Sequence, residues 1–194
     1  MQLLSKGFTS IYASLRHYTL DDLYFPNRGI SIGSDIQMMP WGGSAKVLSF
    51  DVKGVARLGS FLTLVPSFYI RGVIDSPRNN MFIANYVGGA MPGRYIDSQI
   101  PFAGFNYATV AKDYVMVLNL DLRARLAKDF YATLQGAYFN DNDDLPVKFS
   151  ELKPTYVGFA GELAYDSIIG PVRARLQWSD YRGWSAYVGV GFDF

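Results

Sequence analysis

The sequence predicts an all-β protein, an antiparallel transmembrane β-barrel. Three observations lead to this prediction. Segment after segment alternates apolar and polar residues with period two, the pattern of a strand with two different faces. The connections alternate between short turns and long loops, as the two ends of an outer-membrane barrel do. No run approaches the roughly 18 consecutive apolar residues of a membrane helix.

Composition narrows the function classes. The 194 residues carry 18 Lys and Arg against 17 Asp and Glu, and the net charge of +1 argues against a nucleic-acid partner. The chain contains no cysteine, which excludes a disulfide framework and a thiolate metal site. The length suits one domain, residues 1–194. The N-terminal segment lacks the continuous apolar stretch and the cleavage site of a signal peptide.

Four strands are expected before the longest loop, over residues 8–18, 29–39, 45–58 and 61–74. The third shows the pattern well, because Leu48, Phe50 and Val52 alternate with polar residues. One face of such a strand suits lipid and the other a polar barrel interior.

Five strands are expected after that loop, over residues 107–126, 130–140, 155–168, 171–180 and 184–194. In the first of them, apolar residues at even positions from Met116 to Leu126 oppose polar ones such as Asp121. Aromatic residues near strand ends suit the interfacial girdles of a barrel: Tyr24, Phe25, Trp41, Phe130, Tyr131, Trp178, Tyr181 and Trp184. His17, the only histidine, is expected at a strand end in the same interfacial zone.

The expected strand count is odd, whereas single-chain bacterial barrels close with an even number of strands. An open sheet edge in lipid would leave backbone N–H and C=O groups without partners. The chain is therefore expected to be the C-terminal part of a larger barrel.

The connection between the first two expected strands carries a motif. It reads "TLDDLYFPNRGISIGSD", a D-x-x-x-F-P-x-R-G turn that leads into an alternating strand. This turn resembles those of the BamA/TamA superfamily of outer-membrane insertases and translocators, the bacterial surface antigen barrels. The residues that carry the likeness are Asp21 or Asp22, Phe25, Pro26, Arg28 and Gly29. The resemblance implies a sixteen-stranded barrel, of which this chain would supply about the last nine strands.

The longest loop carries a second likeness, "MPGRYIDSQIPFAGFN". In the superfamily an inward-folded loop with an arginine-glycine-aromatic motif precedes the last five strands. Here the order is Gly93, Arg94 and Tyr95. This variant is most similar to the barrel of patatin-like phospholipases, in which a lipolytic domain and a small periplasmic domain precede the barrel.

The resemblance implies that this loop is locked to the lumen wall. Arg94 would reach into the lumen and pair with acidic residues on the strands that follow. Asp121 matches one such position. The second is not matched, because Leu-Gln-Gly at 134–136 stands where an aspartate is expected, and Glu162 is then a substitute partner. Asp121 could instead join a general ladder with the arginines of the same face, which are Arg123, Arg173 and Arg175.

The C-terminal strand resembles the signal that the outer-membrane assembly machinery reads. Tyr187, Gly189, Phe192 and Phe194 carry this likeness, which is also the ordinary pattern of a last membrane strand. In the superfamily this strand forms a weak seam with the first strand, and Gly189 and Gly191 would weaken pairing there.

No catalytic site is expected in this chain. Patatin-like lipolysis needs a serine in G-x-S-x-G and an aspartate partner, and the nearest strings, "GGSAK" and "GWSAY", lack the second glycine. The acidic string "NDNDD" lacks the glycine and the distal glutamate of an EF-hand loop. Neither a metal nor another cofactor is therefore expected.

The leading functional hypothesis is a membrane anchor and translocator in the bacterial outer membrane, the C-terminal barrel of a patatin-like phospholipase. The alternatives are a small porin-like channel or structural barrel and, more remotely, a soluble lipid-carrying barrel. The expected partners are outer-membrane lipid and the outer-membrane assembly machinery, with no nucleic acid. The sequence leaves open whether the barrel forms homo-oligomers.

Overall fold

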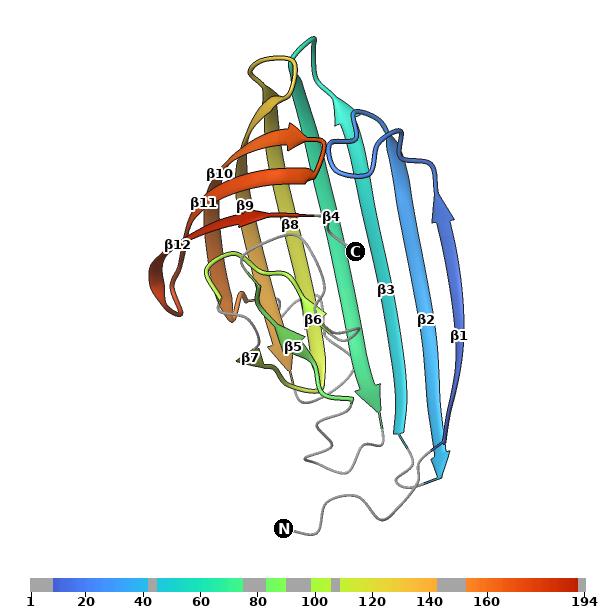
Figure 1. Cartoon of the computed structure of the whole chain (residues 1–194). Helices are drawn as coiled ribbons and strands as arrows, with labels where there is room; N and C mark the ends of the chain where they lie inside the picture. The colour runs from blue at the N-terminus through green and yellow to red at the C-terminus, as the bar shows by residue number, and fades with distance from the viewer. Residues whose placement is uncertain are drawn as a thin grey trace.

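Nine long strands form a single antiparallel sheet in which each strand pairs with its neighbours along the chain. The computed structural model describes residues 9–41, 45–74, 83–89, 99–105, 109–142 and 153–191. The long strands are β1 (Thr9–Tyr18), β2 (Gly29–Trp41), β3 (Ala45–Arg57), β4 (Leu62–Ile74), β8 (Tyr114–Arg125), β9 (Phe130–Asn142), β10 (Tyr156–Ser167), β11 (Gly170–Ser179) and β12 (Gly183–Val190). The sheet curves like part of a barrel wall, with β1 and β12 at its edges (Figure 1). The predicted fold class and strand number are confirmed.

A second, much smaller sheet corrects one expected strand. Residues 107–126 do not form one strand, because β7 (Thr109–Val110) is separated from β8 by residues 111–113. β7 pairs antiparallel with β5 (Tyr86–Val87), which also pairs parallel with β6 (Gln99–Ile100). This small sheet lies on the concave side of the large one (Figure 1).

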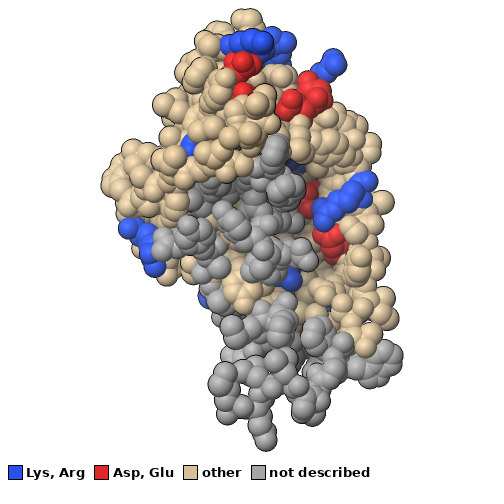
Figure 2. Space-filling model, viewed as in Figure 1, with Lys and Arg blue, Asp and Glu red and all other residues tan. Residues whose placement is uncertain are grey.

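The two faces of the large sheet differ in polarity, as the alternation of apolar and polar residues along each strand requires. The convex face exposes large apolar side chains, among them Leu118, Leu120, Leu134, Leu163 and Leu176. Their neighbours in sequence point to the concave face, which we call the lumen face. Charged side chains gather at the end of the molecule where the short turns lie, and most of the other described surface in this view is uncharged (Figure 2). In the described part of the chain, no helix is long and apolar enough to cross a membrane.

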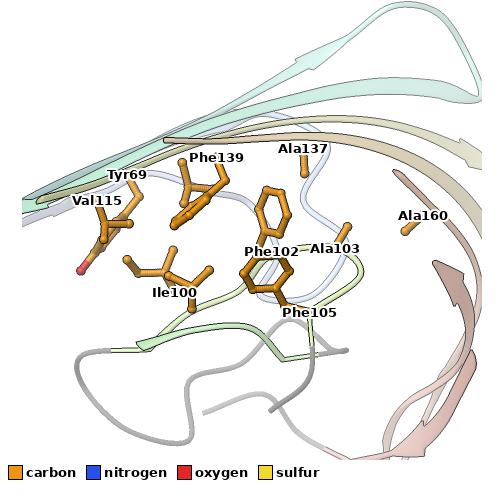
Figure 3. Packing of buried hydrophobic residues seen from close by; sticks show 11 residues of the cluster. Tyr69, Ile100, Phe102, Ala103, Phe105, Val115, Ala137, Phe139 and Ala160 are labelled. Atoms are coloured by element: carbon orange, nitrogen blue, oxygen red, sulfur yellow. The ribbon is translucent and has the colours of Figure 1, made fainter. Parts of the chain in front are cut away.

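The main core lies between the sheet and the segments of the longest loop. Phe102 and Phe105 are buried there, with ring centroids 4.9 Å apart, and Phe139 of β9 lies 5.6 and 5.8 Å from them. The wall side chains point toward these loop residues (Figure 3). Gly104 has a φ of +85°, and a Cβ at this position would lie 2.5 Å from the Cβ of Ser179. This glycine therefore lets the loop backbone lie directly against β11.

Candidate functional site in the barrel lumen

A chain of polar contacts runs across four strands of the lumen face. Gln135 of β9 donates from Nε2 to Asp121 of β8 at 2.8 Å and accepts a hydrogen bond from Arg175 of β11. Arg175 lies 3.5 Å from Glu162 of β10, which also accepts a hydrogen bond of 3.1 Å from Arg173. We call Asp121, Gln135, Glu162, Arg173 and Arg175 the lumen network.

The geometry of the lumen network follows from strand register. Asp121 lies directly opposite Gln135, and Glu162 directly opposite Arg175. The side chains of Glu162, Arg173 and Arg175 are only 7–8% exposed. Charges this deeply buried are tolerated only when they are paired and hydrogen-bonded. The lumen network therefore couples β8 to β11 through side chains as well as through backbone pairing.

The loop that enters the lumen is held at its base by polar contacts. Arg71 of β4 is 6% exposed and donates to the carbonyl of Ile83 at 3.1 Å and to the side chain of Asn85. Asn85 in turn donates to the carbonyls of Lys112 and Asp113 at 2.8 and 2.9 Å. The two ends of the loop are thereby tied to each other and to the wall. Farther in, Gln99 donates to the carbonyl of Gly88 at 2.7 Å.

The β1–β2 turn is organised by its two aspartates. Asp22 accepts the backbone N–H groups of Tyr24 and Phe25, each at 2.8 Å, and Asp21 accepts that of Asn27 at 2.8 Å. Gly29 has a φ of +113°, and a Cβ there would lie 2.8 Å from the Cα of Leu20. The D-x-x-x-F-P-x-R-G spacing is thus explained by acceptors at its start and a required glycine at its end.

This turn places Phe25 inside the lumen. Its ring is 4% exposed and stacks on Tyr131 of β9 at 4.0 Å and 3°. The guanidinium carbons of Arg123 and Arg173 lie 5.8 and 5.5 Å from the ring centroid, within cation–π range. Arg123 also donates to the carbonyl of Pro26. We call these contacts the turn clasp; they join the β1–β2 turn to the opposite part of the wall.

A separate ionic cluster joins the first three strands. Arg16 of β1 lies 2.6 Å from Asp35 of β2 and 2.6 Å from Asp51 of β3. Ser14 and Ser49 also donate to Asp35. Gly33 provides the space, because a Cβ there would overlap the Arg16 guanidinium and lie 2.5 Å from Asp51.

Between the turn clasp and the loop lies a cavity of about 450 Å³. Its lining includes Lys53, Asp121, Glu162 and Arg175 as well as apolar residues of the loop such as Phe102. These residues provide paired charges and amide groups. Such a set of groups suits holding polypeptide segments in place through hydrogen bonds and ion pairs.

Several predicted site residues lie outside the described residues. They are Gly93, Arg94 and Tyr95 of the loop motif and Phe192 and Phe194 of the C-terminal signal. The pairing of Arg94 with Asp121 or Glu162 therefore stays a prediction. Tyr187 and Gly189 lie on β12, opposite Arg175 and Arg173.

Two expectations about aromatic residues are wrong. Phe25 and Tyr131 were expected in an interfacial girdle, but both are buried in the lumen. The two aspartates fold the turn inward, and the ring of Phe25 stacks on that of Tyr131. Sequence reasoning named Gln135 only as standing where an aspartate is expected, and it missed Arg71 and Asn85. Arg71 and Gln135 occupy lumen positions in the period-two pattern, so that pattern could have identified them. No comparable signal marks Asn85.

The apolar outer face, the paired charges of the lumen, and the loop and turn that enter it define an outer-membrane barrel of the BamA-like type. The chain belongs to the OMP85 superfamily, whose family model matches residues 2–194. Membership implies a location in the bacterial outer membrane, where members of the superfamily work with assembly or translocation machinery. No curated protein matched the chain.

Proposed function

We propose that this barrel is the outer-membrane anchor and translocator of a patatin-like phospholipase whose lipolytic domain lies outside this chain. The observation that carries the proposal is the filling of the lumen by the chain itself. Phe102 and Phe105 enter along the wall of β8 and β9, and Phe25 enters from the turn. A wall packed in this way supports an anchor that opens only during secretion or assembly.

The patatin-like assignment rests on the likeness of the loop segment around Gln99–Phe105. This segment packs closely in the lumen, where Phe102 and Ala103 are at most 1% exposed. A sequence that must fit such a packed site is constrained at each of these positions. The lipolytic chemistry itself would be supplied by a serine and an aspartate in another domain, because we expect no catalytic site in this chain.

A porin-like channel is the second candidate. The charged cavity of about 450 Å³ favours it, since paired charges line the water-filled lumens of porins. For this candidate the loop would constrict a pore instead of closing it.

The experiment is a double detection on isolated outer membranes of the native organism. An antibody raised against "NDNDDLPVKFSELKP" detects the polypeptide, and a fluorophosphonate probe labels active serine hydrolases. We expect one band far above 21.7 kDa that carries both signals. An antibody band without fluorophosphonate label would contradict the phospholipase assignment. Ion conductance of the same purified protein in planar bilayers would then test the channel.

A further inference from the structure

The outer face of the sheet contains a hollow that neither the lumen nor the proposed translocation explains. It has a volume of about 540 Å³ and lies over β3, β4, β8 and β9. Its floor is formed by residues with little or no side chain, Gly54, Pro66 and Gly136. We call this hollow the outer groove.

Strand register explains why a groove forms here. Pro66 lies opposite Leu120, and Leu120 opposite Gly136, while Gly54 lies so close that a Cβ there would be 3.7 Å from the Pro66 ring. In this cross-strand row, Leu120 is therefore flanked by positions with small side chains or none, Gly54 and Pro66 on one side and Gly136 on the other. The next row is high, because Phe68 lies opposite Leu118 and Leu118 opposite Tyr138. The glycines and proline around Leu120, beside a row of large side chains, leave the hollow that these residues line.

The outer groove is uncharged, and the polar group on an outward-facing side chain of its lining is the hydroxyl of Tyr138. None of the residues that line it is Lys, Arg, His, Asp or Glu. The polar side chains of Ser67 and Asn119 belong to the lumen face, where Asn119 donates to Ser67 at 3.4 Å. The groove also lies near the middle of β4, β8 and β9, at the depth of the hydrocarbon core when the barrel spans a membrane.

We propose that the outer groove binds one acyl chain of an outer-membrane phospholipid. The proposal depends on the outer-membrane location that the family implies and not on the translocator role. An unfilled groove would leave its lining atoms without van der Waals partners. A helix is about 10–12 Å across, so this volume would take little more than one turn of it. A single flexible hydrocarbon chain is thinner and can lie in a narrow hollow. Lipid surrounds this face on every side, so the hydrophobic effect does not favour the groove over the rest of the face. The preference of an acyl chain for the groove comes from van der Waals packing.

Two glycines on the outer face provide a matched pair of variants. A Cβ on Gly136 would have no atom within 4 Å, so G136F starts a large side chain in open space within the groove. Gly161 of β10 also faces outward, and a Cβ there would lie 3.9 Å from Leu134, in ordinary contact. Since Gly161 does not line the groove, G161F adds the same side chain outside the proposed site.

The test uses the full-length protein in phosphatidylethanolamine vesicles that contain a phosphatidylethanolamine with a diazirine midway along one acyl chain. After illumination, mass spectrometry of peptides maps the crosslinked residues. We expect crosslinks around Pro66, Leu118 and Gly136 to exceed those around Leu163 of β10 several-fold. We expect G136F to remove this excess and G161F to leave it unchanged. Even crosslinking around the barrel, or an excess that survives G136F, would overturn the proposal. Fewer crosslinks in the groove than at Leu163 would indicate that a protein partner covers the groove. That result would also overturn the proposal.

Discussion

Glu162 is the residue on which the electrostatics of the lumen depend most. Guanidinium nitrogens of Arg173 and Arg175 on the neighbouring strand lie 3.1 and 3.5 Å from its carboxylate oxygens. All three side chains are nearly inaccessible to solvent. Desolvation makes isolated buried charges costly, so removal of one partner leaves the others uncompensated. The same side chains thus explain why β10 and β11 hold this register.

Replacing Glu162 with glutamine tests this dependence. The amide keeps the shape but not the charge, and it leaves Arg173 and Arg175 facing each other. We expect E162Q to lower the free energy of unfolding by about 3–5 kcal/mol, measured by urea unfolding of the full-length protein in vesicles. D113N makes the same chemical change at an exposed residue outside the lumen network and should have little effect. Equal unfolding midpoints for E162Q and D113N would contradict the assigned pairing.

Phe25 gives a second prediction at the residue scale. Its ring fills a site formed by Tyr131 and two guanidinium groups, and truncation would leave a cavity there. We expect F25A to destabilise the barrel by about 3–5 kcal/mol in the same unfolding measurement. Leu23, in the same turn, is 63% exposed, so L23A is the matched control. Loss of stability in L23A as large as in F25A would show that the turn, and not the turn clasp, is responsible.

At the scale of elements, the β1–β2 turn shows what the sequence could and could not predict. The motif between two alternating segments predicted a turn, and the aspartates and Gly29 explain it by local chemistry. The direction in which the turn folds depends on Tyr131, Ala164 and Arg173, which are more than 100 positions away in sequence. No local pattern carries that information, so Phe25 was assigned to a girdle.

The strands also show that local features were predictable from the sequence and contacts between distant segments were not. Period-two alternation predicted all nine long strands, because lipid on one side and a polar lumen on the other impose it on each strand separately. It failed at residues 109–113, where β7 pairs inside the lumen and not with the wall. The lumen network was likewise predictable as a set of lumen-facing positions but not as a set of pairs, since pairing depends on register across strands.

The turn should also respond to pH through Asp21. Partial burial acts to raise the pKa of this carboxyl, but the backbone N–H groups of Asn27 and Arg28 and the charge of Arg28 lower the pKa below its ordinary value of 3.8. A lowered pKa in the folded state stabilises the fold above pH 3.8 and loses that contribution as the pH falls through the folded-state value. The stability difference between wild type and D21N should therefore be constant well above pH 3.8 and shrink as the pH falls below 3.8. A difference in urea unfolding that does not shrink as the pH falls below 3.8 would contradict the prediction.

At the scale of the whole molecule, one antiparallel wall carries two surfaces with different tasks. The outer surface is apolar and faces lipid, whereas the inner surface is filled by parts of the same chain that enter from both ends. The loop packs on β8 and β9, and the turn clasp joins the β1–β2 turn to β8, β9 and β11. These contacts connect strands that the sheet itself does not pair. In the translocator role that we propose, they favour a wall that stays closed until a secreted or inserted segment displaces part of the filling.

The central claim is that the chain's own loop covers the lumen wall, and cysteine accessibility tests it most directly. These 194 residues contain no cysteine, so in a single-cysteine variant of the full-length protein, maleimide labelling of peptides from this barrel reports the introduced cysteine alone. Ala137 lies on the wall beneath the loop and is 7% exposed, whereas Lys128 lies in the exposed β8–β9 turn. With a water-soluble maleimide, we expect K128C to react at once and A137C to react only after unfolding in urea. A137C that reacts as fast as K128C in the folded barrel would show a lumen open to water and would contradict the account.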